Sequence, residues 1–244
     1  MIKDWFFSLI TVVVFGITLV YYDIKGRLAL RRGPRAFEEA MASLQKRLLG
    51  VFGISGVTVK VEGRDGFASE GGFIIVSNHQ SMFDVPIFGG ILTRNYPKYV
   101  AKSSLASGIP AISLNLKHGG NALIDRGDRQ QAIEAIDEMG RTCQERDVSA
   151  VIFPEGTRSR DGSLAIYRRS GLAALMRSAP ELPIVPAVID GSWKVFDNNM
   201  LPVPYGTEVR IRFGAPIPRT SGESPRKVLD ACHDFAETTL EAWH

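Results

Sequence analysis

The chain has 244 residues, with a hydrophobic fraction of 45%, a charged fraction of 23% and a formal net charge of +3. These proportions are those of a folded protein and exclude disorder over most of the length. The mild charge argues against a nucleic-acid binder, which usually carries a strongly basic patch. The two cysteines, Cys143 and Cys232, form no Cys-x-x-Cys pair, so we expect buried thiols in a reducing compartment and no metal site.

The first predicted element is an apolar helix. Trp5 to Tyr22 is an uncharged run of 18 residues, which as a helix would reach ~27 Å, just short of the ~30 Å hydrocarbon core of a bilayer. A cleaved signal peptide fits poorly, because Lys3 is the only cation before the run and Asp4 offsets it. We therefore expect a retained membrane anchor.

A basic segment and a second helix follow the anchor. Seven cations gather there: Lys25, Arg27, Arg31, Arg32, Arg35, Lys46 and Arg47. The positive-inside tendency places this flank, and the domain after it, on the cytoplasmic face of the inner membrane. Apolar residues at spacings of three and four, from Phe37 to Leu48, predict an amphipathic helix after Gly33-Pro34. Residues 1–55 are thus expected to form a two-helix membrane-docking element, which either crosses the bilayer or lies in one leaflet.

Strands and helices alternate beyond Gly56. Strands are predicted around 57–61, 73–76, 122–124, 150–153, 184–189 and 209–213, and helices from about Ser81, over 132–143, over 171–176 and after Ser224-Pro225. This alternation predicts one α/β domain over residues 56–244, with a central, largely parallel or mixed sheet flanked by helices.

A candidate catalytic pair lies where one buried strand gives way to a helix. His79 follows the strand, and Asp84 stands five positions later. Open α/β sheets place their sites at the carboxyl ends of strands. A histidine can take a proton at neutral pH, and a carboxylate on its other ring nitrogen fixes the tautomer. The structural alternative is a histidine in a turn and an aspartate that caps a helix.

Two further sequence motifs lie where predicted strands end. Phe153 to Ser159 includes Gly156, which permits close backbone approach, and Thr157 and Arg158, which carry donors suited to a phosphate. Gly120 to Arg126 ends in an Asp-Arg pair whose Arg126 can also bind a phosphate. The alternatives are a surface turn for the first block and an ordinary surface ion pair for the second.

Together these blocks resemble the glycerolipid acyltransferase family, in particular its bacterial 1-acyl-glycerol-3-phosphate acyltransferases. The family's Asn-His-x4-Asp block is matched at Asn78, His79 and Asp84, and its Phe-Pro-Glu-Gly-Thr-Arg-Ser block at Phe153 to Ser159. Its Ile-Asp-Arg and Val-Pro-Ala-Val blocks are matched at 124–126 and 185–188. The resemblance implies roles for Lys102, Arg126 and Arg158 as phosphate contacts, and for Glu155 as a binding or site-organising residue.

The resemblance also implies a reaction. His79 would act as general base, and an acyl group would pass from a thioester to the sn-2 hydroxyl of 1-acyl-glycerol-3-phosphate, giving phosphatidic acid. No Gly-x-Ser-x-Gly elbow occurs, so an acyl-enzyme is not expected. The expected partners are membrane lipids, the lysophospholipid acceptor and acyl carrier protein; no cofactor is expected beyond the donor, acyl-CoA or acyl-ACP. The alternatives are another acceptor (a different lysophospholipid, a lyso-ornithine lipid or glycerol 3-phosphate) or a non-catalytic phospholipid-binding protein.

Overall fold

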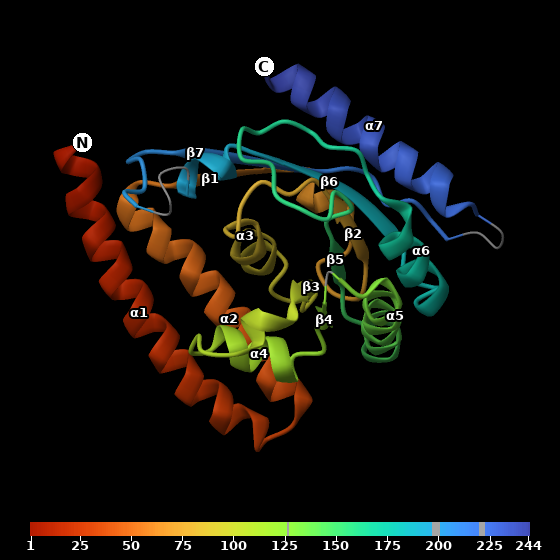
Figure 1. Ribbon diagram of the computed structural model, residues 1–244, viewed down its shortest axis with the longest axis horizontal. Coiled ribbons are helices and arrows are strands. Elements are labelled where there is room, and N and C mark those ends of the chain that lie inside the picture. Colours follow the sequence, from red (N-terminus) through yellow and green to blue (C-terminus); the bar gives the residue numbers. More distant parts are fainter. Residues whose placement is uncertain (126, 197–200, 220–222) are drawn as a thin grey trace.

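A seven-stranded mixed sheet forms the centre of the protein (Figure 1). The computed structural model describes residues 1–125, 127–196, 201–219 and 223–244. The strands are β1 (Thr58–Glu62), β2 (Ile74–Ser77), β3 (Lys98–Lys102), β4 (Ala122–Ile124), β5 (Ala150–Ile152), β6 (Ile184–Asp190) and β7 (Glu208–Phe213). Their order across the sheet is β1-β7-β6-β2-β5-β3-β4. Among these seven strands, only the pairing of β6 with β7 is antiparallel, so β2 to β6 all end at the same edge of the sheet.

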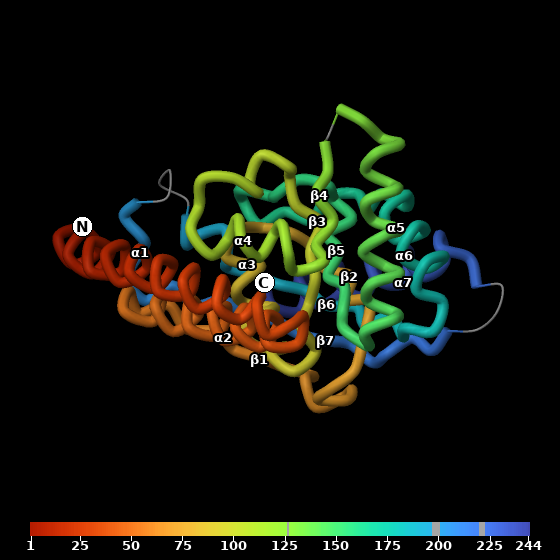
Figure 2. The backbone as a smooth tube through the Cα atoms, turned by 90° about the horizontal axis from the view of Figure 1, so that it is seen from below, coloured from red at the N-terminus to blue at the C-terminus, as the bar shows by residue number. Residues whose placement is uncertain are grey.

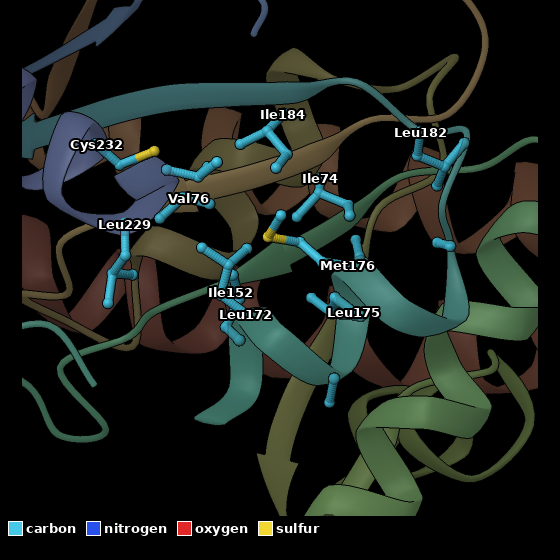
Figure 3. Close-up of a cluster of buried hydrophobic side chains, with 14 of the residues drawn as sticks. Ile74, Val76, Ile152, Leu172, Leu175, Met176, Leu182, Ile184, Leu229 and Cys232 are labelled. Carbon is cyan, nitrogen blue, oxygen red and sulfur yellow. The ribbon is translucent and has the colours of Figure 1, made fainter. Parts of the chain in front are cut away.

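Helices cover both faces of the sheet or pack on the helices that do. They are α1 (Ile2–Leu30), α2 (Pro34–Phe52), α3 (Asp84–Ile91), α4 (Ile112–His118), α5 (Arg129–Arg146), α6 (Arg169–Ser178) and α7 (Pro225–Trp243). Alternate residues of β2 point to opposite faces: Ile74 and Val76 pack against α5, α6 and α7, while Ile75 packs with α3 and the end of α2. The first of these cores is drawn in Figure 3. The expected α/β fold, with a central sheet flanked by helices, is therefore confirmed, and the sheet is mixed.

The two N-terminal helices lie side by side along one flank of the molecule (Figures 1 and 2). α1 is longer than the predicted Trp5–Tyr22 run, because the helix continues into the basic segment as far as Leu30. α2 begins after Gly33, as predicted, and its buried face contacts α1 and α3. The docking helices are therefore packed onto the rest of the protein rather than joined to it by a free linker.

The inner face of α1 carries both polar and apolar groups, whereas its outer face is mostly apolar. Its buried positions include Ser8 and Thr11, whose hydroxyls hydrogen-bond Val203 and Ser55, and Tyr22. The exposed large apolar side chains of this helix include Phe6, Leu9, Val13, Ile17, Val20, Ile24 and Leu28. A helix whose outer face meets water usually carries polar and charged residues on that face. α1 is long and apolar enough to cross a membrane, and its outer face indicates that the protein is membrane-associated.

Candidate active site

The predicted histidine lies on a turn at the carboxyl end of β2. Asn78 fixes the start of this turn, because its side-chain amide exchanges two hydrogen bonds with the backbone of Ile189 in β6, both 2.8 Å. His79 follows with 19% of its side chain exposed. The helix expected from about Ser81 begins instead at Asp84. Residues 80–83 stay in a turn because the backbone N–H groups of Gln80 and Ser81 donate to the Asp84 carboxylate.

The Asp84 carboxylate is fully buried and accepts four hydrogen bonds. Its Oδ2 lies 2.8 Å from His79 Nδ1 and accepts from the N–H groups of Gln80 and Ser81 at 2.8 and 2.9 Å. Its Oδ1 accepts from the Ser192 hydroxyl at 2.5 Å. With Nδ1 bound to Asp84, His79 keeps Nε2 as the ring nitrogen that can accept a proton. This is the arrangement of a general base held by a carboxylate.

The Phe153–Ser159 block, which follows β5, contacts His79 through a ring and a backbone hydrogen bond. The ring of Phe153 stacks on the imidazole, with 4.1 Å between centroids and an interplanar angle of 12°. The Ser159 N–H donates to the carbonyl of His79 at 2.8 Å. The turn after β5 and the turn after β2 therefore form one unit, although their sequences are about eighty positions apart.

Glu155 lies buried behind the histidine. Its Oε1 accepts from the His79 N–H at 3.2 Å, and its Oε2 is buried with no partner among the described residues. Burial raises the pKa of the Glu155 carboxyl to about 7, with the neighbouring Asp84 charge adding to the rise and the His79 N–H opposing it. The carboxyl is therefore close to half protonated at neutral pH, and its observed contact is with the protein backbone.

A cleft of about 840 Å³ opens beside His79 at the carboxyl ends of β3, β4 and β5. Among its lining residues are the predicted Lys102 and Gly156, the latter with φ of +72°, where a side chain would be strained. Its charged lining groups are Lys102, Asp125, Asp128, Arg129, Arg168, Arg169 and Arg177, and its apolar wall includes Val100, Ile133, Ile136 and Ile152. The cleft thus combines a cationic rim with an apolar wall.

The remaining predicted residues lie elsewhere. Thr157 and Arg158 are exposed on the turn after β5 and are not among the residues that line the cleft. Arg126 lies outside the described residues. The structure adds Arg168 and Arg169, which the sequence analysis missed although they stand as a cationic pair directly before a predicted helix. It also adds Ser192, for which no local pattern exists.

In the part of the chain that the structure describes, possible metal ligands lie on α7 and not at the predicted pair. Within the described residues, the His, Cys, Asp and Glu side chains near enough to share a metal ion are His233, Asp234 and Glu237 on α7. Two of these are exposed carboxylates, which are common without a metal. His79 and Asp84 are not in that group.

Comparison with known proteins decides the family. Residues 58–190, more than half of the chain, match the family model described as Acyltransferase. The chain belongs to the acyltransferase family. The matched region of this acyltransferase runs from β1 to the end of β6 and contains His79, Asp84 and the turn after β5. It ends two residues before Ser192.

Curated relatives and a solved structure agree with this assignment. The acyltransferase is 28% identical over 190 residues to human 1-acyl-sn-glycerol-3-phosphate acyltransferase alpha, covering 78% of this chain and 65% of that protein. It is 28% identical over 214 residues to the 1-acyl-sn-glycerol-3-phosphate acyltransferase of Limnanthes douglasii, covering 86% and 69%. The chain thus spans about two thirds of the length of these relatives.

The solved structure is that of PlsC, the 1-acyl-sn-glycerophosphate acyltransferase of Thermotoga maritima. It superposes with a TM-score of 0.79 over 99% of this chain and 96% of that chain, at 20% sequence identity. At this identity the likeness establishes the fold, including α1 and α2, and leaves the chemistry to be argued from the site.

Proposed function

We propose that this acyltransferase moves a fatty acyl group from a thioester to the sn-2 hydroxyl of 1-acyl-glycerol-3-phosphate, giving phosphatidic acid. The observation that carries the proposal is His79, whose Nδ1 is held by the buried Asp84 while its ring borders a cleft with a cationic rim. Relatives named for this reaction support the choice of acceptor.

In the proposed mechanism His79 Nε2 takes the proton of the acceptor hydroxyl. The oxygen attacks the thioester carbonyl, the carbon–sulfur bond breaks, and the leaving thiolate receives the proton back from His79. Asp84 stabilises the imidazolium that exists between these two transfers. No covalent acyl-enzyme is formed, and a positioned base of this kind contributes ~10²–10⁴ in rate.

The cleft offers separate surfaces for the charged and apolar parts of the acceptor and donor. Lys102 and Arg168 are candidates for the acceptor phosphate, because both are exposed cations in the cleft that also contains His79. Arg158 and Arg126 keep the phosphate role that the resemblance implies. The apolar wall at Ile133 and Ile136 suits an acyl chain, since each buried CH₂ is worth ~0.8 kcal/mol.

We further propose that α1 lies in one leaflet on the cytoplasmic side. Its inner face contacts the protein along most of its length, from the Ser8–Val203 hydrogen bond to the contact of Asp23 with the N–H of Ala111 at 2.8 Å. A full crossing would separate these contacts or carry the attached protein into the bilayer. The seven cations of the basic segment are all exposed, although Arg27 also pairs with Asp23, and together they would attract anionic head groups.

An acyl-transfer assay with the full chain in phospholipid vesicles tests the reaction. The acceptors are 1-acyl-glycerol-3-phosphate, other lysophospholipids, a lyso-ornithine lipid and glycerol 3-phosphate, each with acyl-CoA and acyl-ACP. We expect the first acceptor to give the highest kcat/KM, and His79→Ala to lower kcat at least about 10²-fold. His118→Ala, which removes an exposed histidine on α4, is the control expected to keep full activity.

A folded His79→Ala enzyme with full activity would rule out the general-base role. Absence of transfer to every glycerolipid acceptor would contradict the proposed function as a whole. A higher kcat/KM with another acceptor would keep the reaction type and replace the substrate.

A further inference from the structure

Ser192 reaches the catalytic pair from a distant part of the chain. It follows β6 and is the first residue of a short 3₁₀ helix, Ser192–Phe196. Its side chain is fully buried, and its hydroxyl lies 2.5 Å from Asp84 Oδ1, across 108 positions of sequence. Gln80 Oε1 lies farther from this hydroxyl, at 3.4 Å. The short distance identifies Asp84 as the acceptor.

The preceding glycine makes this placement possible. Gly191 has φ of +83°, and a Cβ at this position would lie 2.4 Å from the carbonyl oxygen of Glu208. Only glycine accommodates both the conformation and the close approach. The chain can therefore turn sharply at the end of β6 and bring Ser192 under the first turn of α3.

The two oxygens of Asp84 have unequal support. Oδ2 receives three donors, from His79, Gln80 and Ser81, whereas Ser192 is the donor that the described part of the chain supplies to Oδ1. The torsion that turns an aspartate carboxylate is broad. A buried carboxylate oxygen without a donor is also costly, and it would gain by turning or by taking a proton.

We propose that Ser192 is a positioning residue of acyl transfer, whose hydroxyl fixes the Asp84 carboxylate so that Oδ2 stays on His79 Nδ1. The inference rests on the proposed function, because its kinetic consequence requires His79 to act as the base. Ser192 does not itself touch a substrate in this account. It keeps the carboxylate oriented toward His79 Nδ1 during proton transfer.

The test compares Ser192→Ala with the wild-type full chain in phospholipid nanodiscs. We expect kcat to fall about tenfold, in line with the loss of one hydrogen bond to a charged group, while the acceptor KM changes less than about twofold. Ser192→Thr keeps a hydroxyl and is expected to recover most of the rate. Ser149→Ala is the matched control: it removes another fully buried serine hydroxyl, which accepts from the Phe73 N–H at the opposite end of β5.

The pH–rate profile separates positioning from simple destabilisation. Without the Ser192 donor, the Asp84 carboxylate is no longer held on His79 Nδ1 and stabilises the imidazolium less, so the acidic limb of kcat should move to lower pH. The other ionisable groups near His79 are unchanged in this variant. Glu155 still accepts from the His79 backbone N–H, and Asp190 still accepts from the Gln80 side chain. The charged residues of the cleft are also unchanged: Lys102, Asp125, Asp128, Arg129, Arg168, Arg169 and Arg177. Ser149→Ala should leave the profile unchanged.

A spectroscopic measurement makes the inference independent of turnover. The Nδ1 proton of His79, observed by NMR in labelled protein, should change its resonance in Ser192→Ala and keep it in Ser149→Ala. Unchanged kcat and an unchanged resonance in Ser192→Ala would overturn the inference. An equal loss of kcat per folded molecule in Ser192→Ala and Ser149→Ala would also overturn it. If the wild type transfers no acyl group, the proposed function fails, while the resonance still reports whether Ser192 acts on the His79–Asp84 pair.

Discussion

Single residues of the site differ in how far their roles can be predicted from sequence. His79 and Asp84 are five positions apart, so a strand-to-helix turn is enough to bring them together, and their 2.8 Å contact agrees with that prediction. The stacking of Phe153 on His79 and the hydrogen bond from Ser192 join different strands. Contacts of this kind depend on sheet order, which local patterns do not contain.

Glu155 gives a prediction for the dependence of stability on pH. The folded protein holds the Glu155 proton up to about pH 7, whereas the unfolded chain releases it near the ordinary value of 4.5. The folded state therefore binds more protons between these values, and this residue lowers the stability of the wild type as pH rises through that window. Glu155→Gln keeps an oxygen for the His79 N–H and cannot ionise.

We expect the free energy of unfolding of Glu155→Gln, relative to the wild type, to rise by about 1–3 kcal/mol between pH 5 and pH 8. Urea unfolding of both proteins in detergent at the two pH values measures this difference. An equal difference at both pH values would mean that Glu155 does not keep a proton in the folded protein.

At the scale of elements, the helices and strands with regular apolar spacing were predicted and are present. β3 and α4 were missed for physical reasons. β3 begins with Lys98, which is buried in an ion pair with Glu38 of α2, sixty positions earlier. A lysine usually indicates a surface position, so this buried charge conceals the strand. α4 has only seven residues, too few to show a helical period.

The packing of α2 on α3 gives a second stability prediction. A Cβ on Gly89 of α3 would lie 1.1 Å from Gln45 Oε1, a buried oxygen that accepts from the Tyr99 hydroxyl at 3.1 Å. Gly89→Ala should therefore displace the Gln45 side chain, break its hydrogen bond with Tyr99 and cost about 1–3 kcal/mol. Gly50→Ala in α2 is the control, since a Cβ there meets nothing within 4 Å and should stabilise the helix by ~0.5–1 kcal/mol. Thermal unfolding of the two variants in detergent would distinguish them, and equal shifts would contradict the close contact.

At the scale of the whole molecule, the docking helices and the sheet share buried polar contacts. The Glu38 carboxylate of α2 binds Lys98 of β3 at 2.8 Å and Arg146 of α5 at 2.7 Å. Burial lowers the pKa of Lys98, and the nearby Glu38 charge opposes this shift. These ion pairs cross the domain boundary that the sequence predicts at residue 55.

Glu38→Ala should destabilise the whole protein, because it leaves the Lys98 ammonium buried without its counterion. We expect a loss of about 3–5 kcal/mol in the free energy of unfolding. Glu39→Ala changes the next residue of the same helix. Glu39 is exposed, and its ion pair with Arg35 is long, at 3.8 Å, so its loss should cost less than about 1 kcal/mol. Chemical denaturation of the full chain provides the comparison, and a loss below about 1 kcal/mol in both variants would show that the ion pair does not join the two parts.

The exposed apolar side chains of α1 limit the movement of the protein from one membrane to another. If the protein left the bilayer, Phe6, Val13, Ile17 and their neighbours would be exposed to water. The free-energy cost would be ~1.5–3 kcal/mol for each large side chain that the lipid had fully covered. Exchange between membranes should therefore be slow compared with diffusion within one. Each molecule would then draw on the lipids of a single membrane, and its search for substrate would take place in two dimensions.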